Sequence, residues 1–438
     1  MAISTSDGSG SLWRPLRSST FRNLLVADVV SDVGTFMQSV GAAWLMVSLN
    51  AGPMYVALMQ TASALPFFIL ALPAGAIGDI VDRRKVILFT EIWMVAVAVV
   101  LAVMTIAGKM SPALLLILTF ALSAGDAFET PTWRAVLPEL VQKEDLPAAS
   151  ALNGIEFNFA RAVGPALAGF VIAFAGIGAA FLLNTLSFFG VILVVARWKR
   201  PAVKRTTPPE TVTGATVAAI RYVRYSPAVR IVLLRAGTAM FFASGLLALL
   251  PSIAHRINGS PVGYGMLLGG FGCGAVLGAL VMQHARARWS ADFIVSAGIA
   301  IFGLTTIAAG VLRDLSPLAT VMLIGGAAWI AFISLFNVQV LNQTPDWVRA
   351  RVLAVSMLVF QGAVAAGSAT WGAVAARAGL GKALLWAGVG TILSTVLGFF
   401  LRLPDESIDF TPWNHWLYLL SSVRMPMEGR SWSPLNTT

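Results

Sequence analysis

The chain has 438 residues, of which 57% are hydrophobic and only 11% are charged, and its mean hydropathy is +0.80. Soluble proteins carry charges on roughly 25% of their residues, so a chain of this size could not cover a water-exposed surface with so few. The composition excludes a soluble protein. The net charge of +10 therefore does not indicate a nucleic-acid partner, because membrane proteins collect Lys and Arg in their cytoplasmic loops.

Long charge-free stretches predict twelve membrane-spanning helices. A spanning helix needs about 20 apolar residues, and these unbroken apolar runs lack the alternating polarity of a transmembrane barrel. Short glycine and proline turns divide the longest runs at 50–53, 176–178 and 379–381. The predicted spans are 22–48, 55–79, 87–107, 112–130, 149–175, 178–196, 229–251, 263–283, 291–311, 317–341, 351–375 and 382–401.

The positions of the basic residues orient these helices. Of the 30 Lys and Arg residues, 23 fall on one side of the predicted membrane, five on the other, and Arg161 and Arg235 within spans. Because cytoplasmic loops are enriched in Lys and Arg, we expect both termini in the cytoplasm of a multi-pass protein of the cell (inner) membrane. The first twenty residues are polar, which does not indicate a cleavable signal peptide.

A long basic connection divides the chain into two halves. The predicted organisation is a cytoplasmic N-terminus at 1–21, an N-terminal six-helix bundle at 22–196, a cytoplasmic central loop at 197–228, a C-terminal six-helix bundle at 229–401 and a cytoplasmic tail at 402–438. An internal repeat supports the division, because residues 75–85 after the second span align without a gap with residues 278–288 after the eighth. Two matching six-helix halves are typical of a secondary transporter.

The first copy of the repeat resembles the signature loop between helices 2 and 3 of the major facilitator superfamily. Gly75, Asp79, Arg83 and Arg84 match that motif. A carboxylate at one helix end can cap the N-terminus of a neighbouring helix, and the arginines can pair with acids nearby. We therefore expect a cytoplasmic latch, in which Glu129 pairs with Arg83 or Arg134. The alternative is an ordinary cluster of cytoplasmic positive charge.

A second motif lies in the fifth span, at 160–169. It resembles the pattern associated with exporters of this superfamily and keeps Gly164, Pro165 and Gly169 beside Arg161, although alanine replaces two of the usual glycines. Small residues at this spacing permit close helix contact, and Pro165 bends the helix. The pattern is common in helical bundles, but its place in the fifth of twelve spans favours efflux.

The resemblance extends over nearly the whole chain to one branch of the superfamily, the enterobactin-exporter-like and transmembrane secretion effector proteins. The stretches that carry it are 21–45, 64–85, 138–169, 233–251 and the tail segment 409–416. The resemblance implies an all-α integral membrane protein with twelve transmembrane helices in two six-helix bundles, the major facilitator fold.

Ionisable residues within spans are costly to bury and usually functional. Asp28 and Asp32 lie four residues apart and share a helix face. When two carboxylates lie this close together in a low dielectric, they repel each other if both are ionised, which favours protonation of at least one. A carboxyl group that can take up and release a proton is what a proton-coupled transporter requires. We expect Asp28, Asp32, Asp126 and Glu156 to couple transport to protons, and Glu91 to be interfacial.

Other polar residues within the spans allow two interpretations. Arg161 either neutralises an acid of span 1 or 4 or holds an anionic substrate. The remaining polar candidates could line a cavity or make interhelical hydrogen bonds: Gln38, Asn158, Arg235, Asn337, Gln339 and Gln361.

Cofactor-dependent chemistry is not indicated. The single cysteine excludes an intrachain disulfide and a cysteine metal cluster, and the three histidines lie in separate loops. No phosphate-binding loop of the G-x-x-x-x-G-K-[ST] type occurs, and the glycine run at 265–278 is better explained by close helix packing. We expect no metal, no cofactor and no enzymatic activity.

The sequence therefore predicts a monomeric secondary transporter that alternates access to a cavity between two bundles. Its expected function is proton-coupled efflux of a small amphipathic compound (a drug, siderophore or metabolite), with that compound, protons and the lipid bilayer as its partners. One alternative is a proton-coupled importer of a small nutrient. The other is a membrane-embedded enzyme or scaffold, which would need a polar catalytic cluster or a sizeable soluble domain.

Overall fold

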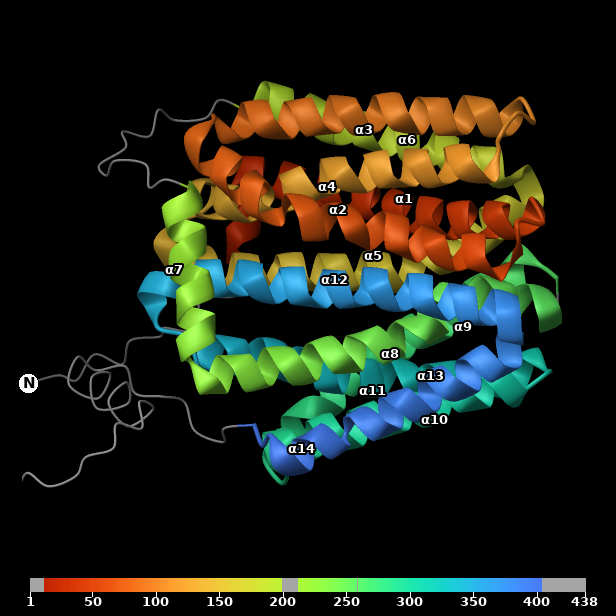
Figure 1. Cartoon of the computed structure of the whole chain (residues 1–438). Helices are drawn as coiled ribbons and strands as arrows, with labels where there is room; N and C mark the ends of the chain where they lie inside the picture. The colour runs from red at the N-terminus through yellow and green to blue at the C-terminus, as the bar shows by residue number, and fades with distance from the viewer. Residues whose placement is uncertain (1–11, 199–211, 258, 404–438) are drawn as a thin grey trace, which may run out of the picture.

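Long helices that run side by side form the described part of the chain, which is residues 12–198, 212–257 and 259–403 of a computed structural model (Figure 1). The N half holds the short turns η1 (Arg14–Arg17) and η2 (Lys143–Asp145) and the helices α1 (Ser19–Ser48), α2 (Gly52–Ile80), α3 (Arg83–Ile106), α4 (Pro112–Leu140), α5 (Leu146–Ala175) and α6 (Ile177–Arg197). The C half holds α8 (Pro227–Ile257), α9 (Pro261–Arg286), α10 (Ala291–Val311), α11 (Leu315–Asn342), α12 (Asp346–Ala378), α13 (Leu380–Ser394) and α14 (Val396–Phe400). Within these residues there is no strand, and the predicted all-α class is confirmed.

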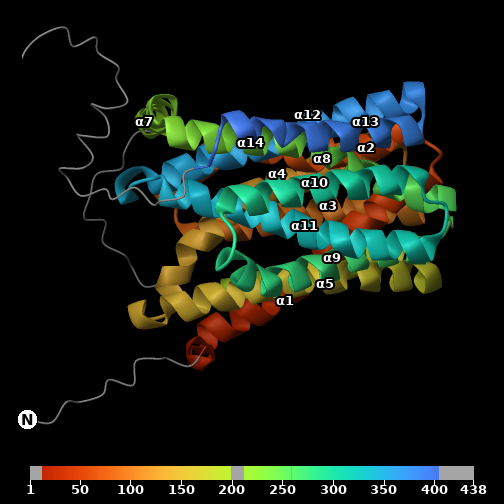
Figure 2. The same cartoon turned by 90° about the horizontal axis from the view of Figure 1, so that it is seen from below.

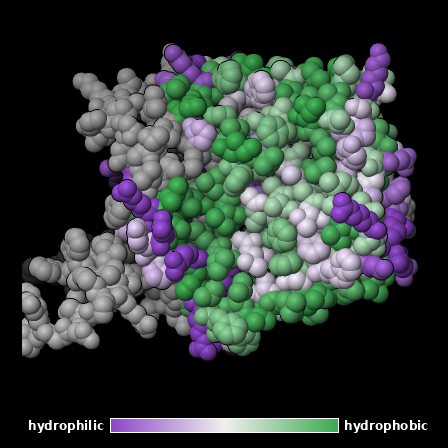
Figure 3. All heavy atoms as spheres, viewed as in Figure 1, coloured by the Kyte–Doolittle hydropathy of each residue, from purple (hydrophilic) through white to green (hydrophobic). Residues whose placement is uncertain are grey.

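Most of the helices have the length and apolar composition of membrane-spanning segments. Among the described residues, eleven are long and apolar enough to cross a membrane. The remaining long helix of the N half is α1, which has 30 residues but carries Asp28, Asp32 and Gln38. Figure 3 shows the matching surface, an apolar belt between two ends that carry the hydrophilic side chains. The chain is therefore a multi-pass membrane protein.

Two of the predicted turns occupy equivalent places in the two halves. Gly176 has φ +83° and separates α5 from α6, whereas Gly379 has φ +92° and separates α12 from α13. Both glycines adopt a positive φ that side chains with a Cβ disfavour. The same backbone device thus joins the fifth and sixth helices of each half.

Two predicted elements differ from the structure. The central connection 197–228 is not a loop throughout, because residues Val212–Tyr225 form α7, which lies across the ends of the bundle (Figures 1 and 2). The fourth span does not end near Pro131 but continues to Leu140 with Pro131 and Pro138 inside it. Membrane helices tolerate internal proline when neighbouring groups satisfy the freed backbone.

The two halves meet through two equivalent helix pairs. The second helix of each half packs against the fifth helix of the other, which gives the pairs α2–α12 and α5–α9. We call the side of the bundle that carries η1, the α2–α3 turn and α7 the basic side, and the side with the turns at Gly176 and Gly379 the opposite side. The long helices of both halves run between these two sides (Figure 1).

The glycine run of α9 has two faces that pack differently. On one face, a Cβ at Gly265 would lie 2.8 Å from the Pro165 carbonyl oxygen of α5, across the boundary between the halves. On the other face, Gly274 leaves no room for a Cβ beside the Leu323 carbonyl of α11. The run therefore lets three helices approach closely, which accords with the packing interpretation of the sequence.

Replacing Gly274 with alanine should destabilise the C half. The new methyl group would overlap a backbone carbonyl that cannot rotate away, and overpacking of this kind costs about 1–3 kcal/mol or more. The midpoint of thermal unfolding in detergent should fall clearly for Gly274→Ala. In α6, Gly190 has open space around its Cβ position, so Gly190→Ala should unfold at or above the midpoint of the parent. Equal midpoints for both variants would contradict this account of α9.

Candidate functional site

Six carboxyl side chains lie in one layer of the N half. Counted along their helices, they are about 12–21 Å from the helix ends of the basic side at 1.5 Å per residue. They come from four different helices, α1, α3, α4 and α5. We call them the acidic cluster: Asp28, Asp32, Glu91, Asp126, Glu129 and Glu156.

Carboxyl groups of the acidic cluster lie against one another in pairs. The carboxyl group of Asp32 on α1 lies against that of Glu156 on α5, and the carboxyl group of Glu91 on α3 lies against that of Glu129 on α4. Glu129 Oε2 also accepts a hydrogen bond from Thr90 Oγ1 at 2.8 Å. Because two carboxyl groups can share a hydrogen bond only when one carries a proton, both contacts are of a kind that binds protons.

Burial makes ionisation of the cluster costly. Glu91 is 2% exposed and Glu156 is 6% exposed, and one carboxyl oxygen of each has no hydrogen-bond partner. The other four acids are partly exposed. A buried charge without a partner is strongly disfavoured, so such a group is satisfied either by a proton or by a positively charged ligand. In the described part of the chain, these acids do not converge as a metal site would require.

In the C half, the buried charge belongs to an ion pair. Arg235 of α8 is 2% exposed and pairs with Asp292 of α10. The guanidinium also donates to Ser296 Oγ at 3.2 Å and to the Leu401 carbonyl at 3.1 Å. Arg235 therefore does not line a cavity as the sequence suggested, because both terminal nitrogens of its guanidinium bind groups that tie α8 to α10 and to the chain after α14.

Arg161 is the arginine within a span of the N half and, unlike Arg235 in the C half, it does not pair with a carboxylate. It lies in α5, five residues beyond Glu156, with its guanidinium carbon 5.7 Å from the centre of the Phe157 ring. Among the described residues it makes no ion pair. The structure thus does not bring it to an acid of α1 or α4, and the cation–π contact is its named interaction.

The predicted latch residues bind within the N half. Arg83 donates to Glu139 Oε1 and to the Ala135 carbonyl of α4, each at 2.7 Å. Arg84 donates to the Val195 carbonyl at 3.0 Å, at the end of α6. Glu129 lies with Thr90 and not with Arg83. Gly75 and Asp79 lie in α2, and their side-chain surroundings fall outside the described residues.

One departure from the family motif has a local explanation. Asp82 stands where glycine is usual and serves as the N-cap of α3, since its carboxylate accepts a hydrogen bond from the Arg84 backbone N–H at 2.9 Å. Aspartate is a preferred N-cap residue. The substitution thus fixes the start of α3 and directs the two arginines toward α4 and α6.

The exporter-like motif of α5 lies where three helices meet. A Cβ at Gly164 would lie 2.6 Å from Phe36 Cβ of α1, and one at Gly169 would lie 3.2 Å from the Pro261 carbonyl oxygen of α9. Pro165 is buried and its carbonyl approaches Gly265. The motif therefore brings α5 into close contact both with the helix that carries Asp28 and Asp32 and with the C half.

Several named contacts between the halves lie toward the opposite side. Trp44 of α1 packs against His255 and Tyr264 of the C half, with ring centres 6.0 and 6.3 Å apart. Thr61 Oγ1 of α2 donates to the Ala365 carbonyl of α12 at 2.9 Å. These contacts join the two halves on the opposite side. Of the partly exposed acids, Asp28, Asp32 and Glu129 lie nearer the basic side, and Asp126 lies at the middle of α4.

The remaining polar candidates differ in their burial and in their hydrogen bonds. Gln38 is buried and accepts a hydrogen bond from Asn184 Nδ2 at 2.8 Å, which is an interhelical bond between α1 and α6. Asn158 is exposed and donates to the Gly154 carbonyl of its own helix. Three candidates lie in α11 and α12 with different burial: Asn337 is exposed, Gln339 is buried and Gln361 is partly exposed.

Glu91, Thr90 and Trp133 complete the site, and the sequence did not identify them. Glu91 was expected at the membrane interface, yet it is buried against Glu129. The indole of Trp133 interacts with Asp28. A sequence signal existed for Glu91, because an acid eight residues inside an apolar helix is costly unless it has a partner.

The two partners of the ion pair in the C half are buried to different extents, so removing one should destabilise the protein more than removing the other. The Asp292 side chain is 26% exposed and the Arg235 side chain is 1% exposed. Asp292→Ala leaves a fully buried guanidinium without its carboxylate and should cost about 3–5 kcal/mol, whereas Arg235→Met leaves an acid that water reaches and should cost less. Thermal unfolding of the two variants should therefore give the lower midpoint for Asp292→Ala. The reverse order would show that the pair is not the buried structural contact described here.

Comparison with known proteins places the chain in one family of transporters. Residues 10–429 match the family model described as transmembrane secretion effector. The chain is 24% identical to the multidrug efflux pump Tap of Mycolicibacterium fortuitum, over 89% of this chain and 97% of that protein. It is 26% identical to the enterobactin exporter EntS of Salmonella choleraesuis, over 59% of this chain and 62% of that protein.

Two further comparisons are more limited. A match to the staphyloferrin A transporter of Staphylococcus aureus is 26% identical and covers 37% of this chain and 41% of that protein. Among solved structures, a bacterial homologue of the human lysosomal transporter Spinster superposes with a TM-score of 0.71 at 14% identity, over 90% of this chain and 98% of that one. At that identity the structural likeness establishes the fold.

Proposed function

Since the chain belongs to the transmembrane secretion effector family of the major facilitator superfamily, we propose that it exports a small amphipathic compound in exchange for protons. Membership makes it a membrane transporter of a small molecule rather than an enzyme. The names of its relatives, which include a multidrug efflux pump and an enterobactin exporter, support export. The proposal adds the direction for this chain, the coupling ion and the residues that carry it.

The acidic cluster is the observation that carries the proposal. Six carboxyl groups in one half, without an arginine or lysine paired to them among the described residues, have to be neutralised by something that comes and goes. Protons are the simplest such species, and Asp32 and Glu156, like Glu91 and Glu129, are already placed to share one. Asp28 and Asp32 stand on α1, which also contacts the C half through Trp44.

Alternating access follows from how the halves touch. The basic side is taken to be the cytoplasm, because Lys and Arg accumulate there, which also puts both termini in the cytoplasm. We infer that the contacts of Trp44 with His255 and Tyr264 close the opposite side in this state, so that the acids are reached from the cytoplasm. Rocking about the close α5–α9 and α2–α12 contacts would open the other side, where external protons load the cluster.

Neutralising the α1 acids should abolish coupling. We expect Asp28→Asn and Asp32→Asn to lower proton-driven uptake of ethidium into inverted membrane vesicles by at least roughly tenfold, because an amide cannot release a proton. The movement of protons is followed with a pH-sensitive dye and that of ethidium by its fluorescence. Asp145→Asn is the matched control, since Asp145 pairs with Arg14 at 3.1 Å outside the cluster.

The outcomes separate the alternatives. If both variants acidify and transport like the parent while Asp145→Asn does the same, the α1 acids do not carry protons. If cells that lack the protein accumulate less of the compound instead of more, the direction is import.

A further inference from the structure

One face of α5 is exposed although it points away from the lipid. Leu167, Phe170 and Phe174 are 43%, 60% and 78% exposed and mark the lipid-facing side of the helix. Arg161 lies nine residues before Phe170, which is about two and a half helical turns, so its side chain leaves the helix on the opposite side. We call that side the inner face, and its exposed or partly exposed members are Gly154, Phe157, Asn158 and Arg161.

The inner face is open toward the basic side and ends at Arg161. Phe157 is 45% exposed, and a Cβ at Gly154 would meet no atom within 4 Å. Beyond Arg161, by contrast, α5 touches the C half, since a Cβ at Gly272 of α9 would lie 3.2 Å from Ala162 Cα and 3.5 Å from the Arg161 carbonyl oxygen. Arg161 therefore lies where the contact between the two halves begins.

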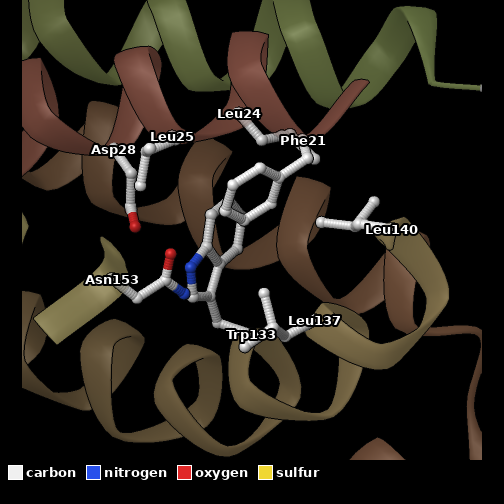
Figure 4. Close-up of a pocket in the computed structure, with 8 residues that line it drawn as sticks. All are labelled: Phe21, Leu24, Leu25, Asp28, Trp133, Leu137, Leu140 and Asn153. Atoms are coloured by element: carbon white, nitrogen blue, oxygen red, sulfur yellow. The ribbon is translucent and has the colours of Figure 1, made fainter. Parts of the chain in front are cut away.

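The acids of the N half are directed away from this arginine. Glu156 precedes it by five residues, which turns the two side chains about 140° apart around the helix axis. Asp28 is directed toward Trp133 and Asn153 instead (Figure 4). The guanidinium lies over the Phe157 ring, which in turn contacts the Phe36 ring of α1 with 5.6 Å between ring centres.

The packing of the bundle does not require a charge at this position. Arg161 precedes the turn glycine Gly176 by 15 residues, and in the C half Val364 precedes Gly379 by the same number. Valine thus occupies the equivalent place in α12, which makes the equivalent contact between the halves through α2. A charged residue inside a span that packing does not require is typical of a functional group.

The chemistry of the inner face suits an organic anion. A guanidinium offers five donors in a planar arrangement that matches the two oxygens of a carboxylate or sulfonate. Its attraction for an anion is stronger here than in water, because part of the solvent around it is excluded. The exposed ring of Phe157 beside it offers an apolar surface to the hydrocarbon part of the same molecule.

We propose that Arg161 binds the acidic group of an amphipathic organic acid, with Phe157 as the apolar wall beside it. The proposal rests on the export function above and adds organic acids to the compounds that the protein carries. A bound acid lies beside the α5–α9 contact, so it occupies the boundary about which the two halves move.

Binding to the purified protein tests this without any gradient. The protein in lipid nanodiscs is titrated with dansylglycine, a fluorescent carboxylic acid, and separately with dansylglycinamide, which has nearly the same shape and no charge; empty nanodiscs give the background. We expect saturable binding of dansylglycine and background fluorescence with dansylglycinamide. Arg161→Gln should weaken binding of dansylglycine by at least roughly tenfold, because a charge-assisted hydrogen bond is lost. Arg161→Lys should retain part of the binding.

Two controls separate the site from general effects. Arg22→Gln makes the same chemical change at an exposed arginine on the basic side of α1 and should bind dansylglycine like the parent. Arg161→Gln should unfold at the midpoint of the parent, since packing does not use the charge; a clearly lower midpoint would assign the arginine to packing and overturn the proposal.

Three binding results would also overturn it: no binding of dansylglycine to the parent, equal binding of the two probes, or unchanged binding by Arg161→Gln. Because no proton gradient is used, failure of proton-driven ethidium uptake in vesicles is a separate result from failure here.

Discussion

The absence of a paired cation for the acidic cluster, among the described residues, is the constraint on which the rest of the structure depends. Carboxylates inside a bilayer need a partner, and the two halves solve this problem in different ways. In the C half, Arg235 and Asp292 neutralise each other permanently and hold α8, α10 and the end of the last helix together. In the N half, Arg161 lies over Phe157 instead of pairing with an acid. The charge of the N half is therefore left for a mobile species, and we propose the proton as that species.

The packing of the bundle connects the acids of α1 with the boundary between the two halves. The exporter-like motif of α5 joins the helix that carries Asp28 and Asp32 to α9 of the C half, through Gly164 on one face and Gly169 on another. Small residues at both contacts leave little side-chain volume to obstruct movement of one half against the other. Trp44 of α1 packs against His255 and Tyr264 of the C half toward the opposite side. A change at the acids of α1 can thus reach the boundary between the halves through a single rigid helix.

Much of the fold could be predicted from the sequence, whereas the pairings could not. The lengths of the apolar runs and the turns at Gly176 and Gly379 suffice to predict most helices, because each depends on neighbouring residues only. The partner of Arg83 depends on where α4 ends. The sequence suggested an end near Pro131, with Glu129 as partner, but the helix continues to Leu140 and brings Glu139 to Arg83 instead. Likewise, Glu91 meets Glu129, and Arg235 meets Asp292, only once the order of helices in space is known.

The most direct test of the account is the number of protons that leave inverted membrane vesicles for each ethidium that enters them. A pH-indicator dye trapped in the vesicles reports the protons, and the fluorescence of ethidium reports its uptake. The account predicts that protons leave in proportion to the ethidium taken up, because the acids of α1 release a proton in each transport cycle. Uptake of ethidium without any movement of protons would contradict it.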